Sequence, residues 1–252
     1  MEPLPKNCKN CDHQLTGKFC AHCGQAADTH KLNMHFIWHE IQHGLIHVDH
    51  GIFYTIKKLL TAPGEMINEF IEGKRIRHFK PVTLVVVLAT LYGLLYHYSI
   101  KGLYQVDPIL PDQNILGAYA IVIAWTTDHA AYSSLISILT NTLASYLVFR
   151  KQRNNFAEHL VLNTFSRGLS LIINLLLLPV FYFSGLPAEN PIMYTLAIQI
   201  IDIFLMYWCY AGFFGGLLKL KILILTMLTF LLMSTINTTF GFIIGLVVEA
   251  FT

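Results

Sequence analysis

The sequence has little charge: of 252 residues, only 13% are Asp, Glu, Lys or Arg. A soluble domain carries about 25% charged residues, so about half of the usual charge is missing. Together with an apolar fraction of 54% and a mean hydropathy of +0.53, this shortage excludes a cytosolic globular enzyme, a disordered tail and a secreted disulfide scaffold. It indicates a membrane protein. The formal net charge of +2 is too small to indicate a nucleic-acid partner.

The sequence also shows no internal repeat and no low-complexity tract. We expect no secretory signal peptide, because the first thirty residues are polar and contain cysteines. The composition changes near residue 80: residues 1–80 hold ten of the seventeen Lys and Arg, four of the five Cys and nine of the twelve His. We therefore predict a cysteine-bearing head at 1–30, interfacial amphipathic helices at 31–80 and a transmembrane bundle at 81–252.

The bundle is predicted from the length of its apolar stretches, since a spanning helix needs about 20 mostly apolar residues. Five stretches are predicted to span the membrane: Val82–Ile100, Ala131–Phe149, Leu169–Leu186, Pro191–Phe214 and Ile222–Val248. The stretch Gly117–Trp125 is apolar but too short, and we expect it to be re-entrant or interfacial. The predicted fold is an all-α membrane protein with about five transmembrane helices, preceded by short interfacial helices and a small N-terminal zinc knuckle.

Basic residues next to short loops predict the orientation of the spans. Ten precede the first span, three lie in the loop at 150–155 and two precede the last span, whereas the opposite loops contain Lys101 alone. With five spans, this asymmetry places the N-terminus in the cytosol and the C-terminus outside.

The strongest local motif is a pair of Cys-x-x-Cys hooks, formed by Cys8, Cys11, Cys20 and Cys23. Four thiolates match the tetrahedral ligand set of a closed structural Zn²⁺ site. A redox dithiol and an iron–sulfur cluster are the alternatives, but a redox motif normally lies on a thioredoxin-like unit that thirty residues cannot form. The pattern predicts structural zinc.

Residues 34–80 are predicted to form three short helices along the membrane. Pro63-Gly64 separates the second from the third, and Gly73 is a plausible C-terminal cap. Four basic residues follow immediately before the first span: Lys74, Arg75, Arg77 and Lys80. Such a cluster attracts anionic lipid headgroups, and the alternative is a topology anchor without lipid specificity.

Three runs of the N-terminal third carry a resemblance to a known family: CKNCDHQLTGKFCAHCGQ at 8–25, HGLIHVDHGIFYTIKKLL at 43–60 and PGEMINEFIEGKRIRHFKP at 63–81. They resemble an uncharacterised family of small bacterial membrane proteins, a domain of unknown function with a zinc-ribbon head and a Pro-Gly…Gly-Lys-Arg…Pro signature. The resemblance implies a bacterial inner-membrane protein and no particular activity.

A histidine ladder at four-residue spacing lies between the head and the bundle: His35, His39, His43 and His47. It contains the HExxH pattern, in which two histidines bind zinc beside a general-base glutamate, here Glu40. One interpretation is the polar face of an interfacial helix. The other is a second metal site on His39, His43 and His47, with Asp49 or His50 completing it.

Two ionisable residues are predicted within the spans, where such groups are costly and tend to mark function or pairing. Asp202 lies near the middle of the fourth span and Arg167 near the cytosolic start of the third. Asp202 is either a proton or cation site of a transporter, or a protonated acid hydrogen-bonded to an asparagine. The second interpretation is favoured, because transporters usually show broken helices in repeated halves.

Two classes of function remain. In the first, favoured class, a non-catalytic membrane protein binds a protein partner through a zinc head and contacts lipid. In the second, a membrane-bound hydrolase or oxidase uses the histidine ladder. An ion or proton transporter that uses Asp202 is a less favoured alternative. A soluble nucleic-acid binder is excluded by the spans.

Overall fold

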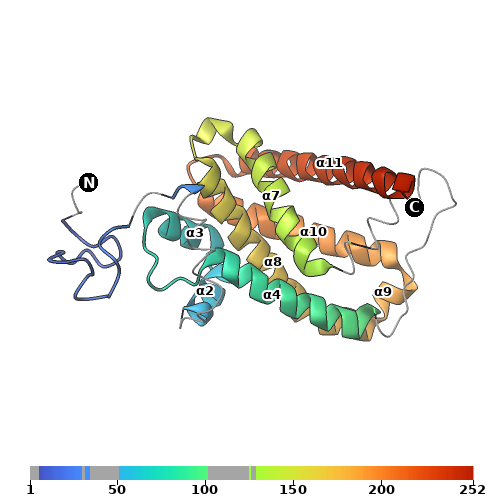
Figure 1. The fold of residues 1–252 in the computed structure, drawn as a ribbon, viewed down its shortest axis with the longest axis horizontal. Helices are drawn as coiled ribbons and strands as arrows, with labels where there is room; N and C mark the ends of the chain where they lie inside the picture. Colours follow the sequence, from blue (N-terminus) through green and yellow to red (C-terminus); the bar gives the residue numbers. More distant parts are fainter. Residues whose placement is uncertain (1–5, 30–31, 35–50, 102–124, 126–128, 252) are drawn as a thin grey trace.

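The computed structural model describes residues 6–29, 32–34, 51–101, 125 and 129–251. These residues are mainly helical, and pairing between extended segments is limited, among them, to two isolated bridges in the head. The all-α prediction is confirmed. The head lies at one end of a bundle of long helices, and the last helix ends at the other (Figure 1).

Long helices of the described residues form the bundle: α4 (Pro81–Tyr96), α7 (Ala130–Val148), α8 (Phe156–Ser184), α10 (Pro191–Phe213) and α11 (Lys219–Phe251). A π-helical turn at His97–Lys101 continues α4, and the short α9 (Leu186–Glu189) precedes α10. The central helix α8 packs against α4, α7 and α10. Within the described chain, α4, α8, α10 and α11 provide four helices that are long and apolar enough to cross a membrane. The chain is therefore a multi-pass membrane protein.

Helix α7 differs from these four helices. It has 19 residues and packs against α4, α8 and α11, but in the described part of the chain it is not among the helices that meet both the length and the apolarity of a membrane span. Serine, threonine and asparagine interrupt its apolar residues, and Ser134, Thr142 and Ser145 are at most 2% exposed. These three polar side chains of α7 thus face the inside of the bundle.

The predicted start of the third span was wrong. The prediction placed it at Leu169, whereas α8 begins at Phe156. A capping box fixes this start: the Glu158 N–H donates to Asn155 Oδ1, and the Asn155 N–H donates to Glu158 Oε2. The first half of α8 carries polar residues, so its hydropathy is too low to identify this half as part of the same long helix. As a result, Arg167 lies well inside the helix rather than near its start.

Two short helices connect the head to the bundle, namely α2 (Ile52–Leu59) and α3 (Pro63–Glu72). As predicted, α3 ends at Gly73, whose φ of +104° is left-handed; it begins at Pro63, so the Pro-Gly pair predicted to separate the helices forms its first turn. Its apolar face is buried against α8 and α10. An ideal Cβ on Gly64 would lie 2.4 Å from Gly212 Cα, so only a glycine at this position allows α3 to approach α10 so closely.

Candidate metal centre and intramembrane polar site

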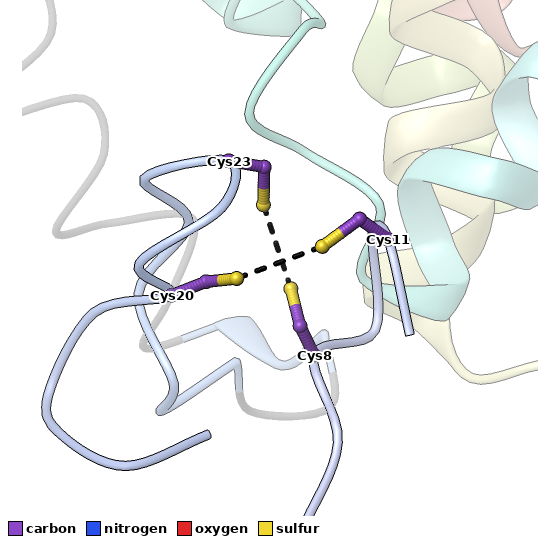
Figure 2. A group of neighbouring side chains, drawn as sticks. All are labelled: Cys8, Cys11, Cys20 and Cys23. Carbon is purple, nitrogen blue, oxygen red and sulfur yellow. Dashed lines mark hydrogen bonds between the residues drawn. The ribbon is translucent and has the colours of Figure 1, made fainter. Parts of the chain in front are cut away.

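The four cysteines of the head converge on one point (Figure 2). Their sulfur atoms all lie within 4.8 Å of one another, with Cys8 and Cys23 sulfurs 3.6 Å apart and Cys11 and Cys20 sulfurs 3.5 Å apart. A tetrahedral Zn²⁺ with Zn–S bonds of about 2.3 Å separates its sulfur ligands by about 3.8 Å. The cluster therefore has the size that a metal ion held by four thiolates requires.

A twelve-residue repeat builds the two hooks in the same way, a feature that the sequence reading missed. The backbone N–H of Cys8 donates to the His13 carbonyl, and the backbone N–H of Cys20 donates to the Gln25 carbonyl. Donor and acceptor of the second bond each lie twelve residues after their counterparts in the first. The two isolated bridges, Asn7–Gln14 and Phe19–Ala26, and the positive φ angles of Asp12 and Gly24 follow the same offset. The sequence signal is Lys-x-Cys-x-x-Cys, at 6–11 and again at 18–23.

The repeat also places equivalent hydrogen bonds on one sulfur of each hook. Desolvation opposes ionisation of Cys23, but the backbone of Gln25 and the side chain of Asn10 outweigh it and lower the pKa of Cys23 to about 7. The backbone of His13 favours the Cys11 thiolate in the same manner, yet desolvation and the neighbouring sulfurs raise the pKa of Cys11 to about 12. Four adjacent sulfurs cannot all ionise alone, and a divalent cation is what allows them to be thiolates together.

A buried amide links the head to the segment that precedes the first span. Gln25 is 3% exposed, and its Nε2 donates to the Gly73 carbonyl at 2.8 Å. Its Oε1 accepts from the backbone N–H groups of Arg75 and Ile76, at 3.0 and 3.3 Å. Because Gln25 directly follows the second hook, the cysteine cluster is tied to the segment that precedes the first span.

A second polar cluster lies inside the bundle, where an arginine and an aspartate form an ion pair. Arg167 Nη1 on α8 is 3.5 Å from Asp202 Oδ2 on α10, with both side chains about a quarter exposed. Arg167 Nη2 also donates to Ser134 Oγ on α7 at 3.0 Å. Both charged residues were identified from the sequence, but their pairing was not predicted. The predicted boundary placed Arg167 near the start of the third span, away from Asp202 in the middle of the fourth. Asp202 is thus neither an isolated acid nor bound only to asparagine.

A separate buried hydrogen-bond network lies closer to the start of α8. Tyr210 donates to Asn163 Oδ1 at 2.7 Å, and Asn163 Nδ2 donates to Ser145 Oγ at 2.8 Å. The Ser145 hydroxyl in turn lies 3.0 Å from His159 Nδ1. The sequence analysis did not predict these partners. The available signal is the spacing of the polar residues 159, 163, 166, 170 and 174 of α8, which follows the helical period.

The basic residues before the first span are used in different ways. The Arg75 Nε donates to the Phe70 carbonyl, and its guanidinium lies 5.5 Å from the centre of the Phe70 ring. Lys74 pairs with Glu72 at 3.7 Å on the surface, and Arg77 is exposed.

The histidine ladder, including His39, Glu40, His43 and His47, lies outside the described residues. Cys209 on α10 is buried in the core.

The helices and the cysteine cluster define the class: a multi-pass membrane protein with an N-terminal cysteine head that is able to hold a metal ion. Residues 49–93 match the model of a family described as a protein of unknown function, DUF3667. No curated protein and no solved structure matches the chain. The matched segment contains α2, α3 and the backbone groups that bind Gln25, but neither the four cysteines nor the Arg167–Asp202 pair.

Proposed function

We propose that the protein is a non-catalytic scaffold of the bacterial inner membrane, whose cytosolic head is a structural zinc module that binds a protein partner. The observation that carries this proposal is the closed set of four sulfurs, tied to the bundle through Gln25. Four thiolates leave a tetrahedral Zn²⁺ no open position for water or substrate. A reducing cytosol keeps the sulfurs available as zinc ligands rather than as disulfides.

The surface of the head supports a partner-binding role. Phe19 lies in the second hook and is 66% exposed, while the equivalent position of the first hook is the polar Asn7. An exposed aromatic side chain on a rigid module is the kind of anchor that protein interfaces use. The head offers this anchor in a fixed position, because Gln25 holds it against the bundle.

Exposed residues near the head support contact with anionic lipid. Phe53 on α2 is 81% exposed and Ile76 is 46% exposed. The exposed cation Lys57 follows Phe53 by about one helical turn, and the exposed Arg77 directly follows Ile76. Apolar and basic side chains exposed together are the combination that binds the interface of an anionic membrane. Arg77 is a stronger candidate for this contact than Arg75, whose guanidinium is occupied by Phe70.

Metal content separates the scaffold from the alternative, a metalloenzyme that uses the histidine ladder. We expect one zinc per chain in the purified protein, complete loss of zinc in the Cys20→Ser, Cys23→Ser variant, and no loss in the His39→Ala, His43→Ala variant. Elemental analysis measures all three. A second metal per chain that disappears with the histidines would contradict the scaffold and favour the hydrolase or oxidase.

The partner surface has its own test. A photoreactive amino acid in place of Phe19 should cross-link in cells to a discrete protein, whereas the same group in place of the exposed Gln14, on the other hook, should not. Adducts of equal yield from both positions, or none from position 19, would contradict a docking role for Phe19.

A further inference from the structure

A small, partly open pocket with polar and apolar residues in its wall lies between α7, α8, α10 and α11. Its volume is about 90 Å³, and Arg167 and Asp202 lie in its wall with Asn141, Asn163 and Ser170. Two methionines, Met206 and Met233, also line it. A water molecule takes up about 30 Å³ in the liquid, so the cavity has room for about three of them.

The cavity wall has hydrogen-bonding capacity that the protein does not fill. Among the described residues, Asn141 Oδ1, Arg167 Nε and Asp202 Oδ1 are buried and have no hydrogen-bond partner. The same is true of Oδ1 of Asn174, a side chain that is 4% exposed and interacts with the Asp202 carboxylate. In a bilayer core each such group costs several kcal/mol unless something hydrogen-bonds to it. The unpaired oxygens need a hydrogen-bond donor and Arg167 Nε needs an acceptor, so a molecule that both donates and accepts hydrogen bonds would satisfy the wall.

A buried polar stripe connects the cavity with the head-side end of α8. His159, Asn163, Ser166, Ser170 and Asn174 are each at most 5% exposed and follow one another at intervals of about one helical turn. The first and last of them are about 22 Å apart along the helix, at 1.5 Å per residue. Hydrogen bonds through Ser145 join Asn163 to His159, so the polar groups extend from the cavity to the beginning of the helix.

We propose that the cavity is an intramembrane hydration site, in which a cluster of about three water molecules bridges Asp202, Arg167 and Asn141. The water exchanges with the aqueous phase on the head side along the polar stripe of α8. Both signs of charge are present in the wall, so the site takes a neutral occupant that donates and accepts, which is water. This inference does not depend on the zinc head. Water beside the carboxylate gives protons a path to Asp202, as in other intramembrane acids.

Methionine oxidation tests the proposal on the intact protein in lipid nanodiscs. A synchrotron X-ray pulse turns protein-bound water into hydroxyl radicals, which oxidise an adjacent methionine to its sulfoxide. We expect Met206 and Met233 to be oxidised several-fold faster than two matched controls. Met66 is 0% exposed in the core, away from the cavity, and Met227 on α11 is 40% exposed on the outside of the bundle. Oxidation of Met206 at the rate of Met66 would mean a dry cavity and would overturn the proposal.

Radicals made only in bulk water provide the second comparison. When they are generated by photolysis of dilute hydrogen peroxide, Met206 should be protected like Met66, because the radicals decay before they reach the cavity. Strong labelling by bulk radicals would show an open surface rather than a bound cluster, and would also overturn the proposal.

A cavity-filling variant completes the test. Ser137→Leu places a larger apolar side chain in the wall, so the X-ray labelling of Met206 should fall to the rate of Met66, while Ser137→Ala should leave it high. Persistent labelling in Ser137→Leu, with Met66 still protected, would contradict the proposal. If Met66 becomes reactive in the Leu variant, the fold is disturbed, and the two radical sources on the unmodified protein decide.

Discussion

Arg167 Nη1 lies 3.5 Å from Asp202 Oδ2, so a cation on the central helix α8 is paired with an anion on α10 inside the bundle. The pairing changes the expectation for Asp202. An isolated protonated acid would tolerate replacement by asparagine, whereas a paired carboxylate leaves the arginine without its counter-ion when it is replaced. The pair also links α8 to α10, the next long helix of the bundle.

We predict that breaking the ion pair from either side destabilises the bundle. Arg167→Met and Asp202→Asn should each cost about 2 kcal/mol, because one charge remains in the bundle without a partner. The double variant Arg167→Met, Asp202→Asn should cost less than the sum of the single changes. Reversible unfolding in mixed micelles measures the difference.

The surface pair Lys74–Glu72, 3.7 Å apart and largely exposed, is the matched control. Lys74→Met should change stability by less than about 0.5 kcal/mol, as is usual for exposed pairs. Strict additivity of the Arg167 and Asp202 changes would mean that the two residues do not interact.

We predict that α3 undocks from α10 when Gly64 gains a side chain. In Gly64→Ala the new Cβ would lie 2.4 Å from the backbone of Gly212, so the helices must move apart, at a cost of about 1–3 kcal/mol for an overpacked contact. Gly216→Ala is the control, since a Cβ there meets nothing within 4 Å. Thermal unfolding in detergent compares the two variants, and equal stability would show that the contact is not tight.

Sequence reasoning recovered the fold class and the cysteine cluster, because both depend on local patterns. Two Cys-x-x-Cys hooks specify a tetrahedral ligand set, and the Pro-Gly pair and Gly73 mark the ends of α3. It misplaced the start of α8, because His159, Asn163 and Arg167 look unsuited to a membrane until their partners are known. Those partners lie on α7 and α10, at separations of 14 to 47 residues, outside the helix itself. Pairing of this kind cannot be read from hydropathy.

We predict that Gln25 holds the head on the bundle without contributing to metal binding. Gln25→Ala removes three hydrogen bonds to Gly73, Arg75 and Ile76 and leaves the buried Gly73 carbonyl without this donor, at a cost of about 1–3 kcal/mol. The variant should retain its zinc but show faster amide exchange at residues 73–76. The exposed Gln14→Ala is the control. Unchanged exchange in Gln25→Ala would mean that other contacts fix the head.

We predict that the two ends of the chain lie on opposite sides of the membrane. If only α4, α8, α10 and α11 crossed the membrane, both ends of the chain would lie on the same side. Our prediction therefore requires α7 to be a fifth crossing. Its contacts with α4, α8 and α11 support this. Reporters fused before Cys8 and after Thr252 should show the first in the cytosol and the second outside. Reporters on the same side would mean that α7 does not cross.

The coordination sphere of the bound metal tests the central claim most directly. X-ray absorption spectroscopy of the purified, metal-loaded protein at the zinc edge should show four sulfur neighbours at about 2.3 Å, with no nitrogen or oxygen in the first shell. That result is expected for a closed structural site on Cys8, Cys11, Cys20 and Cys23. A first shell with histidine nitrogen or a water oxygen would contradict it, because zinc would then have an open or mixed site of the kind that catalysis uses.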